Sequence, residues 1–164
     1  GPLRYILGEW TIASYTMAQS GFPLGVVDNA YSNYLFAGTP RPDVLTNSWR
    51  TAKSGTHEYD PIKDLWVDAT GFARRTNPAV NPFGNAPRLS GASRSAKIIR
   101  VNSTVMRGFT IMEKLKTEFR WEAYDLFNNK TWNTPTLDLS SSSFGRVSGA
   151  GGNRTMQMAL RLIW

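Results

Sequence analysis

The residues that could carry out catalysis or bind a metal ion are few in this sequence and far apart. His57 is the only histidine and there is no cysteine, so thiolate chemistry, disulfides and mixed Cys–His metal sites are excluded. Asp60, Asp64 and Asp68 recur every four residues, but calcium loops place their oxygen ligands at alternating positions around a glycine turn. No nucleophile–base or acid–base pair emerges. We therefore expect neither an enzyme nor a cofactor or metal site.

The glycine-rich stretch from Gly145 to Gly152 is a second candidate, because glycine-rich loops can cradle phosphate groups. A phosphate loop also needs a following Lys and Ser or Thr at the start of a helix, and this stretch has neither. The net charge of +7, with ten Lys and Arg between Arg41 and Arg100, fits a solvated loop or contact with anionic lipid. No nucleic-acid-binding module accompanies these charges, so we expect no nucleic acid partner.

The elements that must position the polar side chains are strands, and the last ten residues, 155–164, give the clearest pattern. Apolar and mostly polar residues alternate strictly there, which predicts a β-strand. At about 3.3 Å per residue and a tilt of about 40°, such a strand spans about 25 Å, the height of the apolar band on membrane barrels. One face would carry Met156, Met158, Leu160, Leu162 and Trp164.

A second alternating segment lies at 117–124. Phe119, Trp121 and Ala123 fall on one face and are expected to contact lipid. The opposite face carries charges, and an arginine that faces lipid at mid-depth costs about 2–4 kcal/mol. We therefore expect a water-filled lumen to be lined by Glu118, Arg120, Glu122, Gln157 and Arg161.

Two weaker alternating segments complete the pattern, and the connections between the four differ greatly in length. The predicted strands lie at about 9–20, 98–107, 116–127 and 154–164, with long connections at about 21–97 and 128–153. Outer-membrane barrels have short turns on the periplasmic side and long loops outside. We therefore predict an all-β fold, an antiparallel transmembrane β-barrel fragment of about four strands with two long extracellular loops. Interfacial aromatic girdles would then draw on Trp10, Trp121, Trp132 and Trp164.

Several motifs carry a family resemblance that covers most of the chain, residues 28–66 matching least. The sequence resembles the C-terminal part of TonB-dependent outer-membrane receptors, in particular the Oar-like group with a carboxypeptidase-regulatory-like domain. The matching motifs are Gly8-Glu9-Trp10-Thr11-Ile12, Gln19-Ser20-Gly21-Phe22-Pro23-Leu24, Phe83-Gly84-Asn85-Ala86-Pro87-Arg88, Phe119-Arg120-Trp121-Glu122-Ala123-Tyr124-Asp125-Leu126-Phe127-Asn128, Phe144-Gly145-Arg146-Val147 and the strand that ends in Trp164.

The resemblance implies a barrel of about 22 strands that is closed by an N-terminal plug and energised by TonB. This chain would form about the last four C-terminal strands, and the TonB complex would act through N-terminal segments that the chain lacks. The partners would be outer-membrane lipid, lipopolysaccharide and a small ligand that the sequence does not identify. The barrel-assembly machinery would recognise the alternating end of the chain, formed by Met156, Met158, Leu160, Leu162 and Trp164.

The expected function is thus uptake of a ligand across the bacterial outer membrane. Two alternatives stay open at this point. The first is a structural or adhesive outer-membrane barrel without active transport. The second is a soluble β-sandwich binding module, for example for carbohydrate, since strands of soluble sandwiches alternate as well.

Overall fold

The computed structural model describes residues 8–30, 40–47, 49–75 and 83–164. The chain divides into two compact units. The first consists of Gly1–Gln19, Ile98–Lys130 and Gly152–Trp164, and the second of Ser20–Lys97 and Thr131–Gly151. No helix in the described part of the chain is long and apolar enough to cross a membrane.

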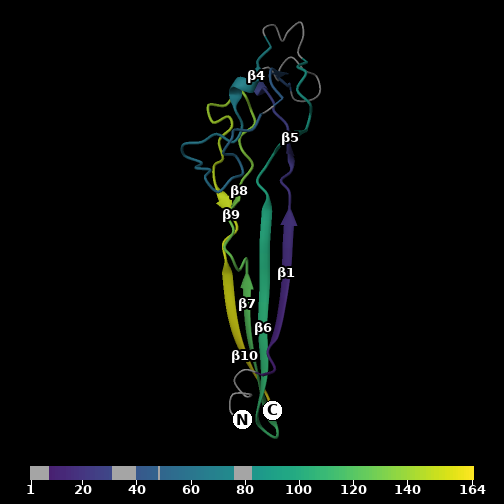
Figure 1. Ribbon diagram of the computed structural model, residues 1–164, viewed down its shortest axis with the longest axis vertical. Helices are drawn as coiled ribbons and strands as arrows, with labels where there is room; N and C mark the ends of the chain where they lie inside the picture. The colour runs from purple at the N-terminus through teal and green to yellow at the C-terminus, as the bar shows by residue number, and fades with distance from the viewer. Residues whose placement is uncertain (1–7, 31–39, 48, 76–82) are drawn as a thin grey trace. The chain divides into compact units, whose positions relative to one another are not determined.

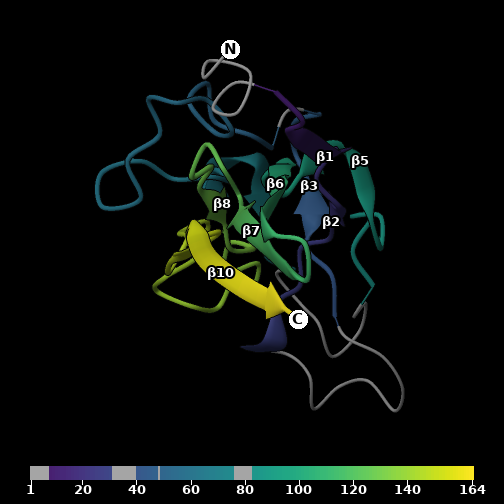
Figure 2. The same cartoon turned by 90° about the horizontal axis from the view of Figure 1, so that it is seen from below.

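The first unit is a four-stranded antiparallel sheet whose strands follow one another in the order β1-β6-β7-β10 (Figure 1). The strands are β1 (Thr11–Gln19), β6 (Ile98–Met112), β7 (Leu115–Tyr124) and β10 (Thr155–Ile163). Figure 2, which looks along the strands, shows the same order. The prediction of an all-β, antiparallel fold is confirmed. Among the described strands, β1 and β10 each pair on one side only, so they are the edges of this sheet.

Strand β6 is longer than the alternation predicts. It continues past residue 107 to Met112 and stays paired with β7 as far as Leu115, which leaves a turn of only Glu113 and Lys114. The pattern is hard to follow beyond Met106 because Arg107 occupies a position on the apolar face. The aromatic rings of Phe109 and Trp10 lie close to its guanidinium and accommodate the charge there, and the strand continues to Met112.

The two long connections are not plain loops, because together they form the second unit, which has its own hydrophobic core. Short ladders join β2 (Pro23–Leu24) to β5 (Ser90–Arg94), β3 (Asp43–Val44) to β4 (Phe72–Ala73), and β8 (Thr131–Trp132) to β9 (Ala150–Gly151). A single 3₁₀ turn, η2 (Ala69–Gly71), precedes β4. The buried core residues are Leu24, Val26, Trp49, Tyr59, Trp66, Val67, Phe72, Ala96, Phe144 and Val147.

Aromatic side chains hold this core together. The Tyr59 ring lies edge-on to Trp66 at 5.1 Å between ring centres, and Trp49 lies edge-on to Phe72 at 4.9 Å. Edge-to-face pairs of this kind are favourable by about 0.5–1.5 kcal/mol beyond the area that they bury. Trp132 also packs here, 5.6 Å from Tyr59. It belongs to the second unit, whereas Trp10, Trp121 and Trp164 belong to the first; the aromatic girdle stays a prediction.

Backbone hydrogen bonds tie the two long connections to each other. The Val27 N–H donates to the Leu137 carbonyl at 3.0 Å, and the Leu139 N–H donates to the Val27 carbonyl at 2.8 Å. The Trp66 N–H donates to the carbonyl of Gly145 at 2.7 Å. Gly145 has a φ of 73°, and a Cβ atom there would lie 2.0 Å from the Val67 carbonyl oxygen, so only glycine fits.

The motif at 83–88 is hydrogen-bonded to the segment at 41–44. The Asn85 N–H donates to the Asp43 carboxylate at 3.1 Å, and the Asn85 side-chain oxygen accepts from the Val44 N–H at 2.7 Å. Arg75 donates to the same carboxylate from the other side. This hydrogen bond from Arg75 lowers the pKa of Asp43 below its ordinary value of 3.8.

The three regularly spaced aspartates all lie in this second unit, where the carboxylate of each accepts a local backbone hydrogen bond in a turn. Asp68 caps the 3₁₀ turn by accepting from the Thr70 N–H at 2.9 Å. Asp64 accepts from the Asp60 N–H at 3.0 Å, and this backbone hydrogen bond is the main reason that its pKa is lowered.

Candidate functional site

The register of the sheet separates its side chains into two faces of different chemistry. Opposite partners across two antiparallel strands share a face, and β10 pairs with β7 as Met156 with Ala123, Met158 with Trp121 and Leu160 with Phe119. These residues, with Leu162 and the following alternate position Trp164, therefore form one apolar face. The proposed assembly signal and the proposed lipid-facing residues lie on it together.

The five residues expected to line a lumen share the opposite face. Gln157 pairs with Glu122, and Arg161 pairs with Glu118. Arg120, two positions from each glutamate on β7, points the same way because side chains alternate along a strand. The sheet thus gathers all five residues on one polar surface. That this surface meets water and the other meets lipid remains a prediction.

Glu122 is the centre of a hydrogen-bonded group on the polar face. Its carboxylate forms a salt bridge with the Nε of Arg120 at 3.0 Å and accepts a hydrogen bond from the side-chain amide of Gln157. The hydroxyl of Tyr124 lies 3.5 Å from the same carboxylate. The Glu122 side chain is only 15% exposed, so these partners compensate for the water that its charge has lost.

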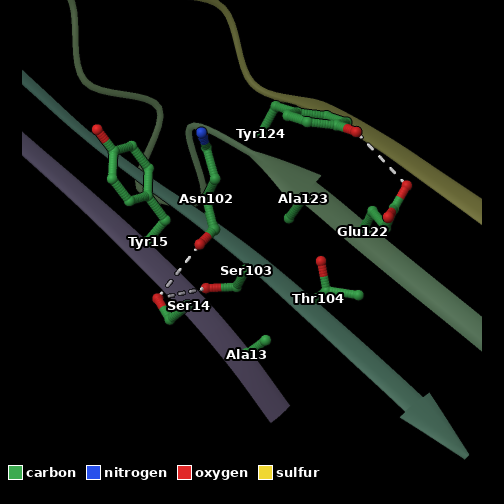
Figure 3. A pocket seen from close by; sticks show the side chains of 9 residues that line it. All are labelled: Ala13, Ser14, Tyr15, Asn102, Ser103, Thr104, Glu122, Ala123 and Tyr124. Atoms are coloured by element: carbon green, nitrogen blue, oxygen red, sulfur yellow. Dashed lines mark hydrogen bonds between the residues drawn. The ribbon is translucent and has the colours of Figure 1, made fainter. Parts of the chain in front are cut away.

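Two hollows open beside this group. The first, of about 190 Å³, is lined by residues of β1, β6 and β7, among them Tyr15, Asn102 and Glu122 (Figure 3). The second, of about 260 Å³, is lined by Arg100, Asn102, Tyr124, Asp125, Gly152 and Asn153. Asn102 and Tyr124 border both hollows, so the two hollows are neighbours.

The site lies at the end of the sheet where β7 ends in a fixed turn. Asp125 has a left-handed backbone with a φ of 54°, a conformation that Asp and Asn adopt more readily than other side chains. Its N–H donates to the Asn102 side chain at 3.0 Å, and its Oδ1 accepts from the Asn129 N–H at 3.2 Å. The next residue, Leu126, donates to the Val101 carbonyl at 2.7 Å. The turn therefore holds Asp125 against β6.

Sequence reasoning missed three residues of this site and one on the other face. Tyr15, Asn102 and Tyr124 obey the same alternation as the predicted lumen residues. The signal was present for Tyr15 and Asn102 in the two weaker segments, and for Tyr124 at the end of segment 117–124. Arg107 was overlooked on the apolar face. It continues the alternation of Val101 and Val105, and the pairing of β6 with β7 shows the same face.

An amphipathic antiparallel sheet with a tight turn at one end and long connections at the other defines the class of transmembrane β-barrel proteins. The chain matches the family model described as outer membrane beta barrel domain over residues 1–157, and it belongs to that family. Its location is the bacterial outer membrane. No curated protein and no solved structure matches the chain.

Proposed function

We propose that this chain is the C-terminal barrel segment of a TonB-dependent outer-membrane receptor and takes part in the uptake of a ligand, rather than being an enzyme. The observation that carries the proposal is the register of the sheet. It places Glu118, Arg120 and Glu122 on one face with Gln157 and Arg161, as a polar lumen wall requires, and gives β7 and β10 a mainly apolar opposite face for lipid. The sequence resemblance to the Oar-like receptors supports the same function.

In this function, the long connections capture the ligand and the polar face forms part of the wall along which it passes. A plug and a TonB-binding segment, both outside this chain, supply the gate and the energy. Lipid covers the apolar face, and the basic residues between Arg41 and Arg100 contact phosphates of lipopolysaccharide. The barrel-assembly machinery captures β10 through its alternating apolar side chains.

A pair of cysteine variants tests which face is the lumen. The chain has no cysteine of its own, so Phe119→Cys and Arg120→Cys each give one spin label, on adjacent residues of opposite faces. In lipid vesicles, the label at 119 should be accessible to oxygen, which concentrates in hydrocarbon. The label at 120 should be accessible to a water-soluble nickel chelate. If instead the label at 119 is accessible to the nickel chelate and the label at 120 to oxygen, the polar face cannot be part of a lumen wall.

A second measurement separates active uptake from a structural or adhesive barrel. Both functions are compatible with membership of the outer-membrane family. Formaldehyde crosslinking in cells should join the protein to TonB. If TonB is never captured while the barrel is assembled and abundant, the structural function is the correct one.

A further inference from the structure

The last strand of the sheet reaches its neighbour without a tight turn that would fix their pairing. Strands β6 and β7 are joined by a turn of only Glu113 and Lys114, and in hairpins the turn type and loop length fix the register. Strand β10 lies beside β7 (Figure 1), but the long connection at 125–154 separates the two in the sequence. Side chains must therefore select the register between β7 and β10.

The apolar face selects this register only weakly. A slip of one residue moves every side chain to the other face, but a slip of two residues keeps each side chain on its own face. In the observed register Leu160 pairs with Phe119. A slip of two residues would place Met158 or Leu162 opposite Phe119 instead. Leucine and methionine have similar volumes and replace each other at little cost, so packing on this face hardly distinguishes the three registers.

The polar face distinguishes them by charge. Along β7 the charges on this face alternate in sign, in the order Lys116, Glu118, Arg120 and Glu122. Arg161, the one charged residue of β10, pairs with Glu118. A slip of two residues would place Arg161 opposite Arg120 in one direction and opposite Lys116 in the other. Opposite charges across two strands attract and like charges repel, so either slip replaces an attraction by a repulsion.

A hydrogen bond on the polar face favours the same register. The side-chain amide of Gln157 donates to the carboxylate of Glu122, its paired residue. The salt bridge with Arg120 at 3.0 Å holds this carboxylate in place. A slip of two residues would move Gln157 opposite Tyr124 or Arg120 and would break the hydrogen bond to its paired residue.

We propose that the order of charges on β7 sets the register in which β10 joins the sheet. The apolar side chains determine which way the faces of β10 point, and Arg161 determines the position of β10 along β7. A barrel closes only with a fixed stagger between its strands, so a slip at β10 would change the geometry of the whole barrel. This role needs neither a ligand nor TonB and is therefore independent of the proposed function.

Disulfide bridging between the two strands measures the register. The chain has no cysteine of its own, so each introduced pair reports one pairing. Leu160→Cys is combined with Phe119→Cys for the observed register, and with Trp121→Cys or Thr117→Cys for the two slips. Diagonal neighbours lie about 7–8 Å apart, too far for a disulfide, so only directly opposite cysteines are bridged. All these positions lie on the apolar face, which leaves the charges unchanged.

The full chain is assembled in outer membranes and oxidised there with copper phenanthroline. The share of bridged molecules is then measured, after unfolding, by the loss of thiols that react with a maleimide reagent. With the charges unchanged, we expect bridging of the pair at 119 and 160 and little bridging of the other two pairs.

Two charge variants of β10 should have opposite effects. Arg161→Glu places a carboxylate opposite Glu118 in the observed register and opposite Arg120 or Lys116 after a slip. Bridging of the slipped pairs should therefore rise several-fold. Ala159→Glu is the matched control, because it adds the same charge to the same face of β10. Its carboxylate would stand opposite Arg120 in the observed register and opposite a glutamate after either slip, so the observed register should persist.

Arg161→Gln covers the case in which the charge-reversed variant is not assembled. It removes the attraction without adding a repulsion, so the slipped pairs should still be bridged more than in the unchanged protein. If only the pair at 119 and 160 is bridged in the assembled Arg161 variants, the charge order does not select the register. The hydrogen bond from the Arg154 N–H to the Asn128 side chain at 3.0 Å would then be the next determinant to test. Equal slippage in Ala159→Glu and Arg161→Glu would also overturn the proposal.

Discussion

The guanidinium carbon of Arg107 lies 4.5 Å from the centre of the Phe109 ring and 5.3 Å from that of Trp10. All three residues belong to the apolar face of the sheet, and Arg107 is only 5% exposed. An arginine open to hydrocarbon at mid-depth costs about 2–4 kcal/mol. Stacked aromatic rings replace part of the lost hydration through cation–π attraction. The rings thus explain how a cation is tolerated on this face.

Replacement of this arginine by lysine should destabilise the assembled sheet. Lysine keeps the charge but has a compact, strongly hydrated ammonium that cannot stack as a planar guanidinium does. We expect Arg107→Lys to lower the free energy of unfolding by about 1 kcal/mol, measured by urea titration in lipid vesicles. Arg161→Lys is the control, because Arg161 lies on the polar face. If both variants lose the same free energy of unfolding, stacking of Arg107 on the aromatic rings does not stabilise the sheet.

Loss of the last side chain should impair assembly more than folding. Trp164 is 91% exposed, so its removal costs the sheet little packing. If the assembly machinery holds β10 by pockets for alternate side chains, Trp164→Ala should lower the amount of heat-modifiable, folded protein in the outer membrane several-fold. Ile163→Ala, on the opposite face of β10, should assemble normally. Normal assembly of the Trp164 variant would remove this residue from the signal.

A methyl group at Gly145 should disrupt the second unit. The positive φ and the approach to Val67 both oppose Gly145→Ala, and a residue held in such a conformation costs of order 1–3 kcal/mol. Limited proteolysis should cut the Gly145→Ala variant faster within the second unit than it cuts the unchanged protein. Gly151→Ala serves as the control, because nothing lies within 4 Å of a Cβ atom there. If both variants resist protease equally, the tight contact at Gly145 is not required.

The second unit should lose stability in acid through Asp43. Its pKa is held below the ordinary value of 3.8, chiefly by the hydrogen bond from Arg75. A carboxyl group with a lowered folded pKa contributes stability that is present above its unfolded pKa and lost as the pH falls through the folded pKa. Protease resistance should therefore decline below about pH 4. Asp43→Asn should be less stable at neutral pH and should show a shallower decline. An unchanged acid profile in the variant would exclude Asp43 as a contributor.

Strands β7 and β10 were predictable from sequence because each has one face of nearly uniform chemistry. The alternation around Trp121 and Met158 fixed the faces of β7 and β10, and the same rule places Glu122 and Gln157 together. The end of β6 was not predictable. Arg107 interrupts the apolar pattern, and its tolerance depends on rings that only pairing and tertiary packing bring close.

The core of the second unit escaped prediction for a different reason. Its members, such as Val26, Trp66 and Phe144, come from irregular segments far apart in sequence and follow no period of two or 3.6. Their burial depends on long-range backbone pairing, for example between Trp66 and Gly145. The length of these segments and the charge of the first suggested loops, because composition does not show where a chain folds back on itself.

The hydrogen bonds between Val27 and the segment of Leu137 and Leu139 have a consequence for how this protein varies over evolutionary time. The two long connections share one core, so neither can be exchanged between related proteins without the other. Loop grafting that replaces residues 20–97 alone would leave Phe144 and Val147 without their buried neighbours. Changes in one connection should therefore be accompanied by changes in the other, and the two should be inherited together.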